Sequence, residues 1–328
     1  MYIEFLSEKN QSKLDIWKDF LRNSGLEPDD SVSRIVLLWD NDTLIATGAR
    51  DGNLLKCIAV DKSHQGEGLT ATIITALRKD AFYEGTKHLF LYTKPYNEML
   101  FSDLFFYPIA QTDRVLLMED KKNGIIQFLG QFPVINHDGK NGCIVMNCNP
   151  FTLGHRYLIE CAAKECEHLY VFVVSEDKSR FSASDRIEMV RQGITHLSNV
   201  TVLPTGPYLI SSATFPSYFL SERDNVTKIH CRLDIEIFIK HYAPKFNITK
   251  RYVGTEPFSN LTNEYNKTLK KYLPEHNIEV IEIPRLEIDG LPVSASKVRE
   301  LIDTNTPEAI KSLVPETTYE YLIKNTLI

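Results

Sequence analysis

The junction at Asn149–His155 constrains the fold more than any other stretch, because it joins an apolar run to a helical pattern. The run Cys143–Met146 predicts a buried strand, and Arg156–Ile159 opens a helix. A strand that turns sharply into a helix leaves free N–H groups at the helix start, and such a terminus binds phosphate. Gly154 allows close approach of a ligand, and His155 can donate to a phosphoryl oxygen. The junction therefore predicts a nucleoside triphosphate site.

Length and composition predict a cytoplasmic protein of about two domains. No apolar run in the 328 residues approaches the roughly 20 that cross a bilayer, so no membrane partner is expected. The N-terminus lacks the basic and then apolar pattern of a secretory signal. The six cysteines show no CxxC spacing and lie mostly in apolar segments, which favours buried thiols in a reducing compartment.

The net charge of −6 is unevenly distributed along the chain. Residues 1–120 hold 19 acidic and 13 basic side chains, whereas residues 121–328 hold 24 of each. Neither part carries the broad basic field that nucleic-acid binding needs, so no nucleic-acid partner is expected. The second part is the less repulsive place for an anionic nucleotide.

The chain shows two patterns, and we place an N-terminal domain at 1–125, a linker at 126–139 and a C-terminal domain at 140–328. The first domain shows a strand, a helix, an antiparallel meander over 33–60, a helix at 69–83, a strand at 89–92, a short helix and a last strand. The second domain alternates strands at 143–148, 169–175, 200–203, 250–253 and 278–283 with helices at 155–167, 184–196, 227–242, 262–272 and from about 294. This alternation predicts an α/β fold with a parallel sheet between helices.

The turn at 149–155 resembles the phosphate-binding signature of the HxGH nucleotidyltransferase superfamily, whose members have a Rossmann-like, three-layer α/β/α (HUP) fold. Thr152 replaces the first histidine of that signature. A threonine hydroxyl can hydrogen-bond phosphate but carries no charge, which leaves His155 as the main imidazole donor. Asn149, Phe151 and Gly154 complete the nucleotide contacts that the resemblance implies.

A second signature, ISxSxxR, is matched near the C-terminus by Val293–Arg299. Ser294 or Ser296 can cap a helix there, and Arg299 lies one turn further on, where its fork can span two phosphate oxygens. Two signatures in the right order, each at a helix start, make nucleotidyl chemistry the favoured interpretation over two ordinary capped helices.

Three further residues have both a functional and a structural interpretation, and a fourth, Arg186, has a structural one. Lys178 and Arg180 follow the strand at 169–175 and are either a clamp over the triphosphate or solvated loop charges. Arg186 is expected to pair along its helix with Asp185 or Glu188. Gly254 ends another strand and either lines an adenine pocket or forms a turn. Mg²⁺ is expected with ATP, bound through the phosphates, and no residue cluster indicates a metal site of the protein itself.

Over nearly its full length the chain resembles the citrate lyase ligase family. The resemblance rests on Met146–Glu160, Ile210–Phe219, Val253–Phe258 and the second signature, and on an acetyltransferase-like domain placed before the nucleotidyltransferase-like one. Threonine at the first signature position is expected for this branch. The family is identified by these motifs together rather than by any one of them.

The resemblance implies a ligase that forms a thioester in two steps. Acetate attacks the α-phosphate of ATP to give acetyl-adenylate and pyrophosphate, and the acetyl group then passes to a thiol. That thiol belongs to the dephospho-CoA-type prosthetic group on the acyl carrier subunit of citrate lyase. His155 is assigned to charge at the α-phosphate, Arg299, Ser294 and Ser296 to the leaving pyrophosphate, and Thr152 to an auxiliary hydrogen bond.

The segment Ile58–Thr70 resembles the pyrophosphate loop of the GNAT acetyltransferases, Q/R-x-x-G-x-G/A, and implies a GNAT-like mixed α+β domain. Gln65, Gly66 and Gly68 match the loop, whereas Thr70 adds bulk at its last position. The fold is therefore expected more strongly than acetyl-CoA-dependent catalysis. We expect this domain to hold the carrier's prosthetic arm, with Asn97 and Tyr107 lining the groove.

Two other functions remain open at this point. One is an adenylyltransferase that acts on a phosphate-bearing acceptor such as phosphopantetheine or nicotinamide mononucleotide, which would leave a stable dinucleotide. The other is a regulatory protein that senses CoA and a nucleotide without catalysis. A protein N-acetyltransferase is disfavoured by Thr70.

Overall fold

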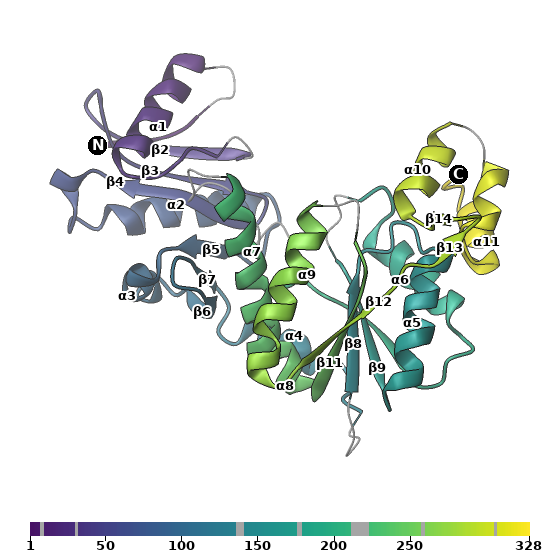
Figure 1. The fold of residues 1–328 in the computed structure, drawn as a ribbon. Coiled ribbons are helices and arrows are strands. Elements are labelled where there is room, and N and C mark those ends of the chain that lie inside the picture. Colours follow the sequence, from purple (N-terminus) through teal and green to yellow (C-terminus); the bar gives the residue numbers. More distant parts are fainter. Residues whose placement is uncertain are drawn as a thin grey trace. The chain divides into compact units, whose positions relative to one another are not determined.

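The computed structural model describes residues 1–328 except for 7–9, 30–31, 136–140, 176–178, 211–222, 257–259 and 305–306. The chain forms two compact units, each with its own sheet (Figure 1). The first unit contains residues 1–127 together with the described part of 212–236. The second contains the described residues of 128–211 and of 237–328.

The first unit is built on a mixed seven-stranded sheet in the order β1-β2-β3-β4-β5-β7-β6. Its strands are β1 (Tyr2–Phe5), β2 (Arg34–Asp40), β3 (Thr43–Asp51), β4 (Leu54–Val60), β5 (Phe90–Thr93), β6 (Tyr107–Gln111) and β7 (Leu116–Glu119). Its helices are α1 (Gln11–Asn23), α2 (Leu69–Tyr83), α3 (Glu98–Ser102), the start of α4 (Gly124–Gly130) and most of α7 (Arg223–Ile237). The antiparallel meander predicted over 33–60 is confirmed.

The strands β4 and β5 separate after a short parallel contact. They pair only at Leu54 with Phe90 and at Leu55 with Leu91, although β4 continues to Val60 and β5 to Thr93. A β-bulge between β3 and β4, with φ +55° at Cys57, lies where the separation begins. The divergence opens the sheet next to the N-terminus of α2.

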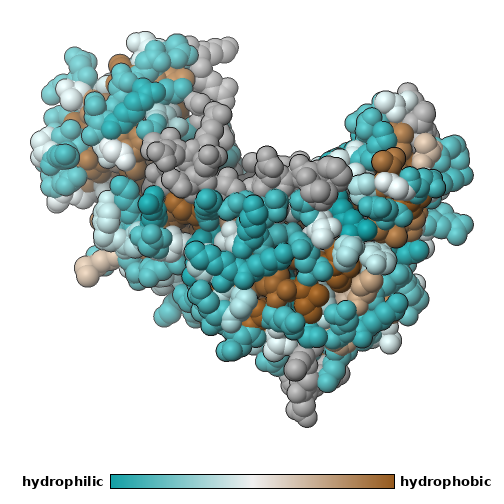
Figure 2. All heavy atoms as spheres, in the orientation of Figure 1, coloured by the Kyte–Doolittle hydropathy of each residue, from teal (hydrophilic) through white to brown (hydrophobic). Residues whose placement is uncertain are grey.

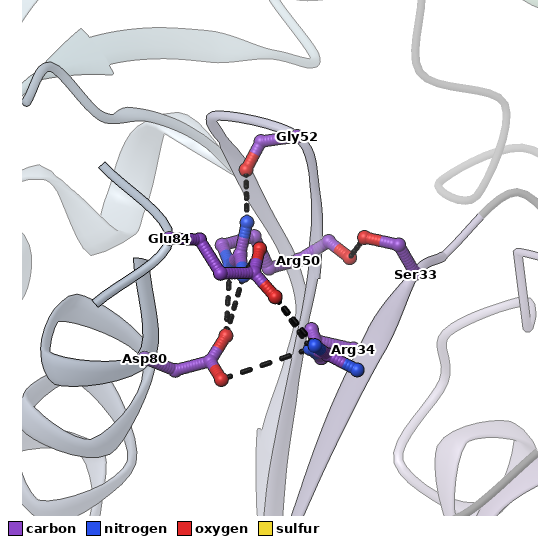
Figure 3. Close-up of polar contacts among 6 residues, drawn as sticks. All are labelled: Ser33, Arg34, Arg50, Gly52, Asp80 and Glu84. Carbon is purple, nitrogen blue, oxygen red and sulfur yellow. Dashed lines mark hydrogen bonds and ion pairs between the residues drawn. The ribbon is translucent and has the colours of Figure 1, made fainter. Parts of the chain in front are cut away.

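The far end of α2 is fixed to the sheet by a charged cluster (Figure 3). The buried Arg50 of β3 donates to Asp80 of α2 at 2.5 Å and to Glu84, the residue that caps the end of α2, at 2.6 Å. Arg34 adds an ion pair with Glu84 at 2.5 Å. Hydrogen bonds from Arg50 and Arg34 hold the pKa of Glu84 below its usual range. The cluster therefore sets the position of the helix whose other end borders the opening in the sheet.

The second unit is built on a five-stranded parallel sheet in the order β10-β9-β8-β11-β12. Its strands are β8 (Asn141–Met146), β9 (Leu169–Val173), β10 (Val200–Pro204), β11 (Ile248–Gly254) and β12 (Glu279–Ile283). Its helices are α5 (Leu153–Glu165), α6 (Ala183–Gly193), α8 (Ala243–Lys245), α9 (Asn260–Tyr272), α10 (Ala295–Asp303) and α11 (Glu316–Lys324).

Helices cover both faces of this sheet (Figure 1). In β9, Val171 and Val173 face a core that includes Ile159 of α5 and Met189 of α6. The alternate residue Phe172 packs on the opposite face against Tyr242 and Phe246, at ring distances of 5.5 and 5.4 Å. A strand that is apolar on both sides requires this three-layer arrangement, and the predicted fold class is confirmed.

Several elements differ from the prediction. The helix expected at 227–242 begins at Arg223 and passes at Phe238 into a π-helical turn that ends at Tyr242. The strand β6, the hairpin β13 (Glu287–Ile288) and β14 (Leu291–Pro292), and α11 were not anticipated. These elements are short, and their patterns are too brief to stand out from a loop.

Within the described ranges, no helix is both long and apolar enough to cross a membrane. Hydrophilic residues predominate on the visible face in Figure 2, with smaller hydrophobic areas between them. All six cysteines are free, and four of them are buried.

Candidate functional site

The strand order of the second unit's sheet has its topological switch point between β8 and β11. From β8, the first strand in the chain, the sheet extends through β9 to β10 on one side and through β11 to β12 on the other. In parallel α/β sheets, ligands bind at the carboxyl ends of the strands that flank such a switch point. The Asn149–His155 turn follows β8 and Gly254 ends β11, so both predicted motifs lie at this position.

Thr152 caps α5 and orients His155. The Thr152 hydroxyl accepts from the His155 N–H at 3.4 Å, and the Thr152 N–H donates to His155 Nδ1 at 3.1 Å. A backbone N–H can only donate, so Nδ1 is an acceptor and the ring proton lies on Nε2. Thr152 is 1% exposed, and its hydroxyl lies 2.9 Å from Nδ1. Its side chain therefore faces His155 rather than the phosphate contact expected from the sequence.

His155 is a neutral hydrogen-bond donor. Removal of the ring from water and the nearby positive charge of Arg285 lower its pKa to about 4. Among the described residues, no group accepts a hydrogen bond from Nε2. The Nε2–H group is therefore available to a ligand oxygen.

Phe151 supports His155 from the core. Its ring is fully buried and stacks on the His155 ring, with centroids 6.0 Å apart and planes 14° from parallel. Its edge lies against Gly193 of α6, where a Cβ atom would come within 2.5 Å of the ring. Phe151, predicted as a nucleotide contact, is thus placed behind His155 and has no face open to solvent.

The two signatures are in direct contact. Arg299 Nη1 donates to the Asn149 carbonyl at 2.6 Å. At Gly154 an added Cβ would lie 3.2 Å from the Val293 carbonyl oxygen. Glycine at this position therefore allows the start of α5 to approach the residue before Ser294, and its predicted ligand contact stays a prediction.

The N-terminus of α10 presents further donors. Ser294 is its N-cap and accepts from Lys297 N–H at 3.2 Å. No described residue accepts the Ser294 hydroxyl proton. Arg299 Nη2 donates to the exposed Ser296 hydroxyl at 3.0 Å, so the protein uses two of the five N–H groups of Arg299. Neutral and cationic donors thus converge beside His155.

Asn149 and Arg186 hold the loop that follows β9. The Asn149 side-chain oxygen accepts from Phe181 N–H at 3.2 Å. Arg186 is fully buried and donates to the carbonyl oxygens of Phe181 and Asn147 at 3.0 Å and of Val174 at 2.6 Å. The Arg186 side chain thus satisfies inward-facing carbonyls, which need donors. Of the expected pairing along its own helix, an interaction of charges with Asp185 is present.

Two further predicted residues of the second unit, Arg180 and Gly254, are described by the structure. Arg180 forms an ion pair with Asp303 at the end of α10, next to the second signature. Lys178 lies outside the described residues, as does the motif at 210–219 beyond Ile210. Gly254 has open space around its Cβ position, with Leu158 at 4.0 Å, and its carbonyl accepts from Asn266 at 3.0 Å.

Arg285 is a residue that the sequence analysis missed. It follows β12, donates through Nε to the Thr255 carbonyl at 2.7 Å and forms an ion pair with Glu256. Thr255 and Glu256 directly follow β11, so Arg285 stands at the carboxyl edge of the sheet. The rule that polar residues after parallel strands converge would have identified it.

The first unit contains a cleft of about 640 Å³ between the diverging strands β4 and β5. Gln65, Gly66 and Gly68 line it, and both glycines have positive φ, +90° and +76°, with no atom near their Cβ positions. Asn97 also lines the cleft and donates to Thr93 at 3.0 Å. Tyr107 does not line it, because Tyr107 lies on β6, which β7 separates from β5.

No three His, Cys, Asp or Glu side chains in the described part of the chain converge as a metal-binding set. The functional groups of the site are donors and cations, which suit anionic oxygen ligands.

Comparison with known proteins identifies the family. Residues 141–322 match the family described as the citrate lyase ligase C-terminal domain. The [citrate [pro-3S]-lyase] ligase of Klebsiella pneumoniae is 43% identical over 96% of this chain and 94% of its own. The proteins of that name from Escherichia coli K12 and Haemophilus influenzae Rd are 39% and 38% identical, over 92% and 96% of this chain and 88% and 96% of theirs.

The second unit is a Rossmann-like, nucleotidyltransferase-like fold, and the first is GNAT-like in strand order and in its divergent β4 and β5. The chain belongs to the citrate lyase ligase family. The family predicted from the four sequence motifs is confirmed.

Proposed function

We propose that this protein is an ATP-dependent ligase that acetylates the prosthetic-group thiol on the acyl carrier subunit of citrate lyase. Relatives covering nearly the whole chain carry the name [citrate [pro-3S]-lyase] ligase, which supports the assignment. The observation that carries it is the joining of both signatures through Arg299 and Asn149, which leaves His155 Nε2–H and the Ser294 hydroxyl proton for phosphate oxygens.

The first step is the formation of acetyl-adenylate. An acetate oxygen bonds to the α-phosphorus, the bond to the bridging oxygen breaks, and pyrophosphate leaves with that electron pair. Acetate is already ionised at neutral pH, so no general base is needed. The barrier is the approach of two anions, and preorganised donors lower it more effectively than a proton relay.

In this step His155 acts as a neutral donor at the α-phosphate. Its proton lies on Nε2 because Thr152 N–H occupies Nδ1. Ser294, Ser296 and Arg299 are assigned to the leaving pyrophosphate, and Arg180 to the rim beside them. Mg²⁺ would be held by the nucleotide phosphates, in keeping with a site made of donors and cations.

The second step transfers the acetyl group to sulfur. The thiol sulfur bonds to the acetyl carbon, the carbon–oxygen bond to AMP breaks, and the thiol proton passes to solvent. A dephospho-CoA-type arm suits the cleft of the first unit, because its Gly66 and Gly68 N–H groups donate to no described residue and can receive a pyrophosphate. Free thiols throughout the chain are consistent with action in the reducing cytoplasm.

ATP–pyrophosphate exchange with a panel of carboxylates tests the proposal. We expect exchange that requires acetate and falls at least about 100-fold in His155→Ala, because one preorganised donor at the reacting phosphate is lost. The matched control is His196→Ala, an exposed histidine that pairs with Glu160 on the side of α5.

Exchange that needs no carboxylate, or that survives His155→Ala, would contradict the proposal. A stable dinucleotide product in place of free AMP would instead indicate an adenylyltransferase. Absence of any turnover in the folded wild-type protein would favour a sensor.

A further inference from the structure

The residues after β12 bring one more cation to the start of α5. Arg285 is followed by Leu286, whose carbonyl accepts from Val293 N–H at 3.0 Å. Val293 in turn is the residue that Gly154 approaches, with 3.2 Å from the Val293 oxygen to the Gly154 Cβ position. The residue after Arg285 is therefore bonded to Val293, which packs closely against Gly154 in the first turn of α5.

The head group of Arg285 is held from the opposite side by the end of β11. Its Nε donates to the Thr255 carbonyl at 2.7 Å, and its backbone N–H donates to the Thr255 hydroxyl at 3.2 Å. Nη2 forms an ion pair with Glu256, whose side chain is 9% exposed, compared with 26% for Arg285. A guanidinium fixed by a carboxylate and a carbonyl keeps its position without a ligand.

The charge of Arg285 acts on His155. It adds to burial in lowering the pKa of that ring, in keeping with the place of Arg285 after β12, at the same carboxyl edge of the sheet as the His155 turn. Arg299, which belongs to α10, contacts the Asn149 carbonyl at the start of the turn. The two arginines thus come to this site from different elements.

We infer that Arg285, oriented by Glu256 and Thr255, is a further catalytic residue that neutralises charge at the α-phosphate where acetate attacks. This inference rests on the proposed acetate activation. In that reaction the α-phosphate and the incoming carboxylate are both negative. His155, the donor assigned to the α-phosphate, is uncharged, and Arg299 is assigned to the leaving pyrophosphate. A fixed cation next to His155 lowers the repulsion and takes no part in proton transfer.

The same geometry gives Glu256 a positioning role. Its carboxylate holds one edge of the guanidinium, so its replacement by glutamine leaves the positive charge but loosens it. Lysine at 285 retains the charge and loses the planar two-sided attachment.

The test measures acetate-dependent ATP–pyrophosphate exchange and the pKa of His155 by NMR in four variants. For Arg285→Gln we expect a loss of about 100-fold in kcat with a smaller change in the KM for ATP, and a rise in the His155 pKa. Arg285→Lys should recover at least about tenfold of that loss, and Glu256→Gln should lose about tenfold. The control is Arg156→Gln. Arg156 is the next residue of α5 after His155 and pairs with Glu160, so the exchange rate of this variant should stay within about twofold of the wild-type rate.

Wild-type kcat in Arg285→Gln, or an unmoved His155 pKa, would overturn the inference. Equal losses in the glutamine and lysine variants, with unchanged thermal unfolding, would also count against a charge role. If the wild-type protein showed no acetate-dependent exchange, the proposed function would fail instead. ATP affinity and the His155 pKa would then still decide whether Arg285 faces the phosphate, with at least about tenfold weaker ATP binding expected for Arg285→Gln.

Discussion

At the scale of single residues, the site depends on a histidine that is kept uncharged. A protonated His155 would attract phosphate more strongly, but the Thr152 N–H already points at Nδ1 and Arg285 repels a second charge. Protonation would place two donors face to face and two cations close together. The positive charge of the site is therefore carried by arginines, which stay charged throughout the physiological pH range. His155 instead offers one hydrogen-bond donor in a fixed orientation.

We expect His155 to remain neutral across the physiological range, with an NMR titration midpoint near 4 rather than the usual value near 6.5. Because the unfolded state binds this proton more readily, His155 adds stability at neutral pH that is lost as the pH falls from about 6.5 through about 4. Exchange activity should accordingly show no ionisation from His155 between pH 6 and 8. A midpoint near 6.5 in the folded protein would contradict this account.

At the scale of elements, the position of the catalytic ring is set by helix packing. Gly193 near the end of α6 lies against Phe151, and Phe151 stacks on His155 at the start of α5. The contact couples two helices that cover the same face of the parallel sheet. A displacement of α6 would therefore move the ring that carries the donor.

Gly193→Ala tests this coupling, because its Cβ would come within 2.5 Å of Phe151. In an exposed helix the same change stabilises by up to about 1 kcal/mol, but overpacking here should destabilise by about 1–3 kcal/mol. Urea unfolding should show this loss, and exchange activity should fall as Phe151 shifts. The matched control is Gly130→Ala at the end of α4, where nothing lies near the Cβ position and stability should not fall.

The order of elements was largely predictable, whereas their pairing was not. Every strand of the second sheet was anticipated, because runs that are apolar on both faces stand out between amphipathic helices. The short strand β6 and the hairpin β13–β14 were missed, although the hairpin links Arg285 to the second signature. A two-residue strand has no period from which it can be recognised.

At the scale of the whole molecule, the chain crosses between the two units more than once. Residues 223–236 lie in the second half of the sequence but belong to the first unit, where Asp234 influences the pKa of Tyr92 on β5. The boundaries at 125 and 139 remain predictions, and a third crossing follows at 236, where α7 gives way to the π-helical turn. Deleting residues 1–120 would therefore remove the sheet to which α7 belongs, and point variants are the better test of the first unit.

Gly66→Val should separate the two half-reactions. The β-branched side chain would fill the open space beside the cleft and disfavour φ +90°, so transfer to the carrier should fall at least about tenfold while acetate-dependent exchange persists. Gly52→Val is the matched control, since it strains another open, positive-φ turn of the same unit away from the cleft. Equal rates of acetyl transfer to the carrier in the two variants would show that the cleft takes no part in the reaction.

The sequence by itself determined the family, the fold class and the phosphate chemistry, because these depend on local patterns: apolar runs, capping residues and two signatures at helix starts. Only the tertiary structure decided where each signature residue lies and what it contacts. It turned Thr152 toward His155, placed Phe151 in the core, gave Gly154 a packing role and brought Arg285 to the site. The reason is that burial and charge proximity arise between segments more than 100 residues apart, as between Asn149 and Arg299, and no local pattern encodes them.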